Sequence, residues 1–197
     1  FVGSAQDYGF EKGNVILEGS LSATSSNQKS SYIKSSEFNF YPKAGFFVSN
    51  NFALGLDFQV GSSSRTTNHD LSNEEVNKGN TLGGGVFGRY YFLELGSRFK
   101  TYTELSAKYN TNRSSFKSRN VEIDDIRING FNVNAGIGAN FFLTDKIAIN
   151  FSFADVLRYG SSKEKGSNAG RDSYFVANLN NFGNFFSTSR FGLTFKL

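Results

Sequence analysis

Apolar and polar side chains alternate along eight segments of this 197-residue chain. The clearest case is 131–141, where Phe131, Val133 and Ile137 share one parity and Asn132 and Asn134 share the other. A period of two is that of a β-strand with one apolar face and one polar face. The eight segments are 14–24, 37–48, 54–60, 82–92, 100–109, 131–141, 147–153 and 191–197. The pattern therefore predicts an all-β protein with eight strands.

The connections between these segments alternate strictly in length. Short links separate the second from the third, the fourth from the fifth and the sixth from the seventh segment, whereas the others are long and polar. Outer-membrane barrels have short periplasmic turns, long external loops and an even strand number. The segments also approach the ~9 to 11 residues that cross a bilayer at a tilt. We therefore predict an eight-stranded antiparallel up-and-down transmembrane β-barrel over 13–197, in the bacterial outer membrane with both termini periplasmic. Its long external loops are predicted at about 25–36, 61–79, 110–127 and 159–187.

The last strand must pair, because an unpaired edge exposes a row of N–H and C=O groups. Pairing with the first strand would close the barrel. The apolar parity of the last strand consists of Phe191, Leu193, Phe195 and Leu197, and Gly192 lies on the other parity. Residues 1–12 are predicted to form an N-terminal lead, in which 1–5 resemble the end of a signal peptide.

The polar parity carries charges of both signs, and these are predicted to face the lumen. They are Glu18, Glu37, Lys43, Asp57, Arg89, Glu104, Lys108, Arg190 and Lys196. An eight-stranded barrel is only just wide enough for side chains, and an unpaired charge there would be strongly unfavourable. We therefore expect one network of paired charges that fills the lumen. Asp155 falls on the outward parity, at the long-loop end where a charge is tolerated.

The apolar parity is predicted to face lipid. Its members include Val15, Phe40, Leu56, Ile137, Ile149 and Leu193. Aromatic residues of this parity should form two interfacial girdles. The girdle at the short turns would contain Phe46, Tyr90, Phe92, Phe141 and Phe195, and the other would contain Phe38, Phe58, Tyr109, Phe131 and Phe153.

Composition narrows the function classes. Cysteine is absent, which excludes a disulfide framework and a thiolate nucleophile. The net charge of +4 is small and the basic residues are scattered among acids, so nucleic acid is not an expected partner. The sequence contains no run of 18 or more apolar residues, so it predicts no transmembrane helix. We expect no cofactor and no resident metal.

Five stretches carry a resemblance to a known family: 13–22, 42–56, 88–92, 140–148 and the last strand. They resemble the small outer-membrane β-barrels of the OmpA/OmpX type, in the porin-like outer membrane protein β-barrel form. The resemblance implies a barrel surrounded by outer-membrane lipid and lipopolysaccharide. It also implies that the barrel-assembly machinery reads the last strand during insertion, and it allows for a larger envelope protein complex as a partner.

We interpret the chain as a non-enzymatic barrel whose loops carry its structural or partner-binding role. One alternative is a lipid A-modifying enzyme, built from His69, Asp70 and the serines 62–64 of the same polar stretch. Another is a soluble, lipocalin-like carrier with its apolar face inward. Further hypotheses concern Ca²⁺ at the carboxylates of 122–125, lipopolysaccharide phosphates at Lys163, Lys165 and Arg171, and strand extension or docking by 178–186.

Overall fold

The computed structural model describes residues 8–69, 73–118, 121–166, 168, 170–177 and 190–197, except for the side chains of 122–125 and 190. This part of the chain contains nine strands and a short 3-10 turn, η1 (Lys29–Ser31). The strands are β1 (Val15–Gln28), β2 (Ile33–Ser49), β3 (Phe52–Thr67), β4 (Glu75–Leu95), β5 (Phe99–Ser118), β6 (Val121–Phe142), β7 (Ile147–Glu164), β8 (Asp172–Ala177) and β9 (Arg190–Lys196). Within these ranges, no helix is long and apolar enough to cross a membrane.

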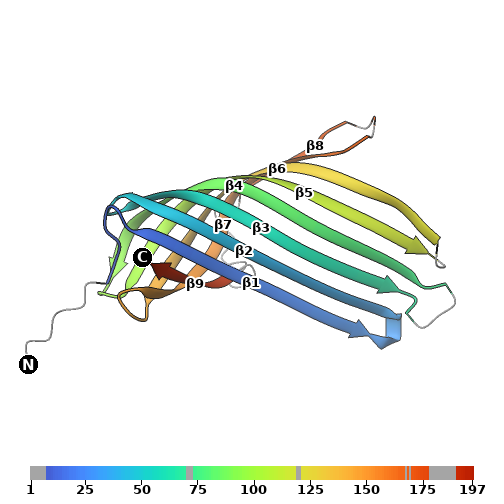
Figure 1. Ribbon diagram of the computed structural model, residues 1–197, viewed down its shortest axis with the longest axis horizontal. Helices are drawn as coiled ribbons and strands as arrows, with labels where there is room; N and C mark the ends of the chain where they lie inside the picture. Colours follow the sequence, from blue (N-terminus) through green and yellow to red (C-terminus); the bar gives the residue numbers. More distant parts are fainter. Residues whose placement is uncertain (1–7, 70–72, 119–120, 167, 169, 178–189) are drawn as a thin grey trace, which may run out of the picture.

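The sheet closes into a ring of eight antiparallel strands (Figure 1). Strands β1 to β7 pair in chain order, and β9 lies between β7 and β1. Its register is fixed on both sides, since Thr194 pairs with Glu18 of β1 and with Ala148 of β7. The predicted eight-stranded up-and-down barrel is therefore confirmed. The ends of the chain meet the short turns, because Lys196 N–H donates to the Lys146 carbonyl and Lys12 N–H donates to Asn50 Oδ1.

The long connections are mostly strand, so the prediction of four external loops is wrong for most of their described residues. The outermost pairs of the four hairpins are Gln28 with Ile33, Thr67 with Glu75, Ser118 with Val121 and Ser162 with Asp172. These hairpins project from the end of the barrel opposite the short turns (Figure 1). The β1–β2 and β3–β4 hairpins are rich in Ser, Thr and Asn on both faces, so these two lack the apolar–polar contrast that reveals a strand in the sequence.

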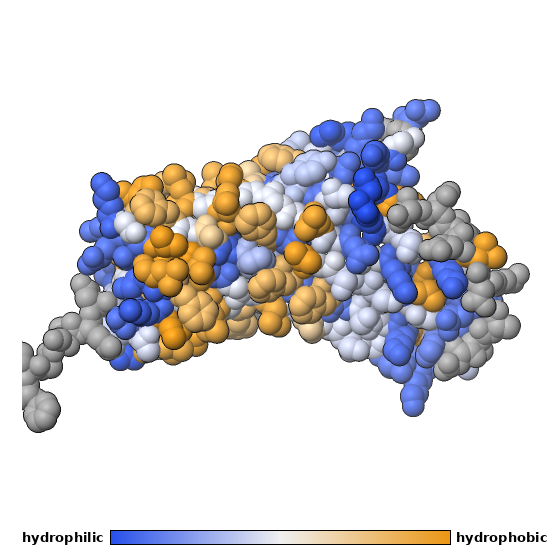
Figure 2. Space-filling model, viewed as in Figure 1, coloured by the Kyte–Doolittle hydropathy of each residue, from blue (hydrophilic) through white to orange (hydrophobic). Residues whose placement is uncertain are grey.

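The apolar parity lies on the outside of the barrel, as predicted. Val15, Phe40, Leu56 and Leu193 are each more than a third exposed, while Ile137 is half-buried. Ile149 is also half-buried. All five aromatic residues of the girdle at the short turns are exposed, as are four of the other girdle, with Phe153 half-buried. Figure 2 shows the resulting hydrophobic band, which gives way to hydrophilic residues on the projecting hairpins.

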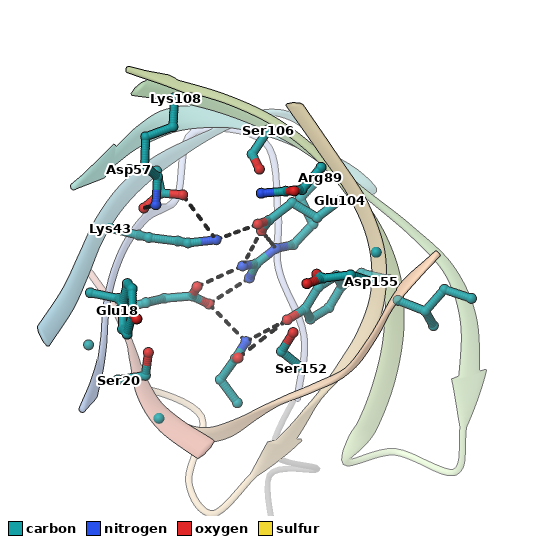
Figure 3. Close-up of a pocket in the computed structure, with 18 of the residues that line it drawn as sticks. Glu18, Ser20, Lys43, Asp57, Arg89, Glu104, Ser106, Lys108, Ser152 and Asp155 are labelled. Atoms are coloured by element: carbon teal, nitrogen blue, oxygen red, sulfur yellow. Dashed lines mark hydrogen bonds and ion pairs between the residues drawn. The ribbon is translucent and has the colours of Figure 1, made fainter. Parts of the chain in front are cut away.

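Two bulges in β7 reverse its parity locally, which makes the outward placement of Asp155 wrong. Phe153 and Val156 have no partner in β6, so Asp155 pairs with the inward Gly136. One extra residue in a strand moves the following side chains to the opposite face. Asp155 therefore faces the lumen (Figure 3), and Leu157 returns to the outside beyond the second bulge.

The eighth position of the ring is shared by two strands. β9 pairs with residues 147–152 of β7, and β8 pairs with residues 157–162 of the same strand. The region 178–186, for which strand extension or docking was a hypothesis, lies outside the described residues.

Candidate functional site

Six of the nine charged residues predicted for the lumen lie together inside the barrel (Figure 3). We call them the lumen ion cluster: Glu18, Lys43, Asp57, Arg89, Glu104 and Lys108. Three are carboxylates and three are cations, so the cluster carries no net charge at neutral pH. Strand register explains the assembly, because Glu18 pairs with Lys43 and Arg89 pairs with Glu104 on adjacent strands.

Arg89 is the centre of the lumen ion cluster and is only 1% exposed. Its Nη1 and Nη2 donate to Glu18 Oε1 and Oε2 at 2.6 and 2.7 Å. Its Nε and Nη2 donate to Glu104 Oε2 at 2.9 and 2.6 Å. The planar fork of the guanidinium matches carboxylates in this bidentate way. The Tyr102 ring also stacks on it, with the guanidinium carbon 4.0 Å from the ring centroid.

Two lysines complete the neutralisation. Lys43 Nζ donates to Glu104 Oε1 and lies 3.8 Å from Asp57 Oδ2. Lys108 Nζ lies 3.0 Å from Asp57 Oδ1, in an ion pair that does not have hydrogen-bond geometry. Asp57 Oδ1 is therefore balanced by charge rather than by a directed bond. Because Asp57 is 3% exposed, this charge balance is what makes its burial tolerable.

Neutral side chains connect the lumen ion cluster to the seam where the barrel closes. Tyr91 Oη donates to Asn140 Oδ1 at 2.8 Å, and Asn140 Nδ2 donates to Thr194 Oγ1 at 2.8 Å. The Thr194 hydroxyl donates to Glu18 Oε1 at 2.7 Å. This chain links β4, β6, β9 and β1. Tyr91, Asn140 and Thr194 were not predicted as site residues, because their inward parity is the only sequence signal that marks them.

Glu37 and Lys196 lie away from the lumen ion cluster, so the prediction of one network of nine residues is wrong for these two. Glu37 accepts a hydrogen bond from Asn39 Nδ2 at 2.7 Å, further along β2 toward the projecting hairpins. Lys196 donates to the Gly9 carbonyl at 2.9 Å, at the opposite end of the barrel. The Arg190 side chain lies outside the described residues. Parity predicts which face of the sheet a residue lies on, but not its position along the barrel axis. Glu37 lies on the same face as Lys43 but six residues away, which is about 20 Å along a strand.

A layer of apolar and aromatic side chains closes the end of the lumen at the short turns. This mouth layer consists of Tyr8, Phe10, Ile16, Phe47, Ala53, Tyr91, Tyr102, Phe142 and Ala148. Phe10 is at its centre, with its ring centroid 4.5 Å from that of Phe47, 4.9 Å from Tyr91 and 5.1 Å from Phe142. Together with the lumen ion cluster, the mouth layer makes two successive fillings of one lumen.

The N-terminal residues of the mouth layer are held in place by polar contacts. Arg98 Nη2 donates to Tyr8 Oη at 2.7 Å, and Gly13 N–H donates to the Phe47 carbonyl at 2.8 Å. Tyr8 and Phe10 are each only 9% exposed. Residues 8–12, predicted as a mere lead, therefore fold into the mouth of the barrel. The segment 1–5 that resembles a signal peptide lies outside the described residues.

Glycines make room for the aromatic rings of the lumen, and Gly55→Ala is expected to destabilise the barrel by roughly 1–3 kcal/mol through overpacking. An added Cβ at Gly55 would clash with the Ala44 carbonyl oxygen and lie 2.6 Å from the Phe87 ring. The matched control is Gly84→Ala, whose Cβ would meet Phe58 at an ordinary 3.6 Å. Urea unfolding in phosphatidylcholine vesicles measures both. Equal stability of the two variants would contradict the close packing of Phe87.

The described residues of the proposed enzyme, metal and lipopolysaccharide sites do not form a catalytic or metal-binding arrangement. His69 Nδ1 lies 3.3 Å from Glu74 Oε2, while Ser63 faces the opposite side of β3 from Ser62 and Ser64. Asp70 and the side chains of 122–125 lie outside the described residues. Among the side chains that the structure does describe, no group of three or more His, Asp or Glu could hold a metal ion. Of the three cations proposed to meet lipopolysaccharide, Arg171 donates to Ser161 Oγ at 3.5 Å, and Lys163 and Lys165 lie at the tip of the β7–β8 hairpin.

Comparison with known structures supports the same architecture. The outer membrane protein OprG of Pseudomonas aeruginosa matches with 12% identity and a TM-score of 0.54, over 96% of this chain and 98% of that chain. The N-terminal β-barrel domain of Pseudomonas aeruginosa OprF matches with 13% identity and a TM-score of 0.45, over 94% and 98% of the two chains. Outer membrane protein W of E. coli matches with 10% identity and a TM-score of 0.48, over 95% and 99%. No protein-family model matches the sequence, and no curated protein matches it. The likeness to OprG shows that the chain has the fold of the small outer-membrane β-barrels.

Proposed function

We propose that this chain is an integral outer-membrane β-barrel without enzymatic activity, whose lumen is closed by its own side chains. Both termini lie in the periplasm, and the projecting hairpins support the envelope or bind a protein partner, in a larger envelope complex or alone. In this proposal the last strand, Phe191–Leu197, is the part that the assembly machinery reads. The proposal rests on the closed eight-stranded fold and on the side chains inside it.

The observation that carries the proposal is the combination of an exposed apolar belt with a buried ion cluster. Leu17, Leu54 and Val86 are 44%, 48% and 56% exposed, whereas Arg89 and Asp57 are 1% and 3% exposed. In a protein surrounded by water, the apolar residues would be buried and the charged residues exposed, which is the reverse of what is seen here. Hydrocarbon around the belt removes the contradiction, because apolar side chains then lie in an apolar solvent.

The same observation disfavours the soluble carrier. A lipocalin-like barrel keeps its apolar face inside to hold a ligand. Here the inside carries the lumen ion cluster, and its cavity of about 90 Å³ is lined mainly by charged, hydroxyl and amide groups. An apolar ligand would have to displace paired charges from that cavity, which is strongly unfavourable.

The enzyme hypothesis is disfavoured by geometry. A nucleophile, a base and an orienting group must lie within hydrogen-bond reach of one another. Of the residues in that hypothesis, His69 Nδ1 lies 3.3 Å from Glu74 Oε2, and Ser63 faces the opposite side of β3 from Ser62 and Ser64. The charged groups of the lumen ion cluster are engaged with each other, and Arg89 donates to two carboxylates at once. Side chains that hold one another in this way serve closure better than proton transfer.

The wild-type chain is expected to show no stable, large openings in planar lipid bilayers, because the lumen ion cluster and the mouth layer both fill the lumen. Single-channel recording of the full chain, refolded in detergent and inserted into the bilayer, measures this. A porin prepared in the same way controls for insertion and should give regular conductance steps. Stable large openings of the wild-type chain would contradict the closed lumen.

A further inference from the structure

Two arginines face each other on the outside of the barrel, beyond its apolar belt. Arg113 of β5 and Arg127 of β6 are register partners. Tyr109 and Phe131, four residues away on the same strands, form an outward pair and are 54% and 41% exposed. The intervening register is regular, so the arginines share this outward face. Like charges directly opposite each other destabilise a sheet, and this pair therefore needs an explanation.

The height of the pair relative to the aromatic girdle suggests that explanation. The next outward pair above Tyr109 and Phe131 is Thr111 with Asn129, which share a 2.9 Å hydrogen bond, and the arginines follow. Four residues span ~13 Å along a strand. At the ~45° tilt of a membrane strand this becomes about 9 Å along the membrane normal. Because aromatic girdles lie at the membrane interface, the guanidinium groups stand at the level of the polar headgroups.

Two lysines extend the arginine pair across the neighbouring strands. Asn80 of β4 pairs with Arg113, and Lys78 is the next residue of the same face toward the hairpin tip. On β7, Lys163 pairs with Asn129, one outward position from Arg127. Arg113 and both lysines are exposed, and Arg127 is half-buried. Among the side chains that the structure describes, no carboxylate forms an ion pair with any of these four cations. Asp125 pairs with Ser115 on the same face, and its side chain lies outside the described residues.

We propose that Lys78, Arg113, Arg127 and Lys163 form an external phosphate clamp that binds the phosphorylated headgroup of an outer-leaflet glycolipid. The guanidinium fork matches phosphate oxygens bidentately, and two opposed forks can hold one phosphate between them. The bound anion turns the repulsion within the arginine pair into attraction to a common partner. This inference rests on the membrane orientation proposed above, which places the clamp at the outer leaflet.

The clamp predicts a selective loss of lipid binding when its arginines are neutralised. We expect the double variant Arg113→Gln/Arg127→Gln to bind diphosphorylated lipid A about 30-fold more weakly, at roughly fivefold for each cation lost. Titration of the detergent-solubilised full chain, followed by native mass spectrometry, measures the affinity. The matched control is Lys29→Gln/Lys34→Gln, which removes two exposed cations of η1 and β2 and should change the affinity less than about twofold. An equal loss in both double variants would overturn the clamp, because binding would then follow net charge alone.

Two further arms identify the source of the phosphate. Dephosphorylated lipid A should bind wild type and Arg113→Gln/Arg127→Gln equally, and a persisting difference would show that the arginines contact some other part of the lipid. Inorganic phosphate at millimolar concentration should leave lipid A bound, and full displacement would make the site one for free anions instead.

In phosphatidylcholine vesicles without lipid A, the arginine variant should unfold at the same urea concentration as wild type or a higher one, because the repulsion between Arg113 and Arg127 is gone. A chain that fails to enter these vesicles would contradict the proposed membrane location, separately from the clamp.

Discussion

Replacing Arg89 by alanine is expected to lower the free energy of unfolding by roughly 3 to 5 kcal/mol, because removing one partner of a buried ion group leaves the other charges unpaired. Arg89 is 1% exposed and donates to Glu18 and to Glu104. Without it, two carboxylates share a narrow lumen with one fewer cation. Urea unfolding of the full chain in phosphatidylcholine vesicles, followed by the loss of compact gel migration, measures the effect.

Two variants separate charge from side-chain removal in this experiment. Arg65→Ala removes an exposed arginine near the end of β3 and should stay within about 0.5 kcal/mol of wild type. Glu18→Gln/Arg89→Met removes one charge of each sign, so Glu104 and Asp57 keep their lysines and most of the stability should return. If Arg89→Ala and Arg65→Ala lose the same stability, the lumen ion cluster does not hold the barrel together.

The sequence predicts the faces of this barrel well, for a physical reason. In the proposed membrane orientation, lipid on one side and a polar lumen on the other impose a contrast at every second residue. Val15, Leu56 and Leu193 show it on the outside, and Arg89 and Asp57 show it on the inside. The same contrast identifies six members of the lumen ion cluster, because cross-strand neighbours of opposite sign occupy the inward parity. The alternation in residues 191–197 also predicts a last strand, and its pairing with the first strand closes the ring.

Where water touches both faces of the sheet, the contrast vanishes and the prediction fails. The hairpin that ends at Thr67 and Glu75 is one example, since residues 61–67 and 75–80 are almost entirely polar or glycine on both faces. The bulges at Phe153 and Val156 are another, because a bulge is a property of the pairing of two strands and shifts Asp155 without any local signal. The folding of Tyr8 and Phe10 into the mouth was missed for a third reason. Those residues pack against strands that are distant in sequence, and no periodicity marks such contacts.

In the proposed closed lumen, the lumen ion cluster and the mouth layer act as two barriers in series. An ion that crosses must pass the lumen ion cluster and also the mouth layer, whose aromatic side chains pack around Phe10. A cavity of about 280 Å³ lies beside the N-terminal residues at the mouth, lined by Tyr8, Glu94 and Lys100 among others. Removing one barrier leaves the other in place, so closure should tolerate the loss of either one.

Stable conductance is therefore expected only when both barriers are weakened together. The cluster variant Glu18→Ala/Arg89→Ala removes one charge of each sign, and the mouth variant Tyr8→Ala/Phe10→Ala removes two rings. Each alone should stay closed in planar bilayers, while the combined variant should give resolved, stable openings.

The control for the combined variant joins Glu18→Ala/Arg89→Ala to Phe38→Ala/Phe40→Ala, which removes two outward rings that are 46% and 39% exposed. It deletes the same number of aromatic side chains but leaves the mouth layer intact, so it should stay closed. Openings in the cluster variant alone would mean that the N-terminal residues do not seal the barrel. A combined variant that stays closed would place the effective barrier nearer the hairpins, among neutral side chains such as Thr81, whose Oγ1 donates to Asn112 Oδ1 on the adjacent strand.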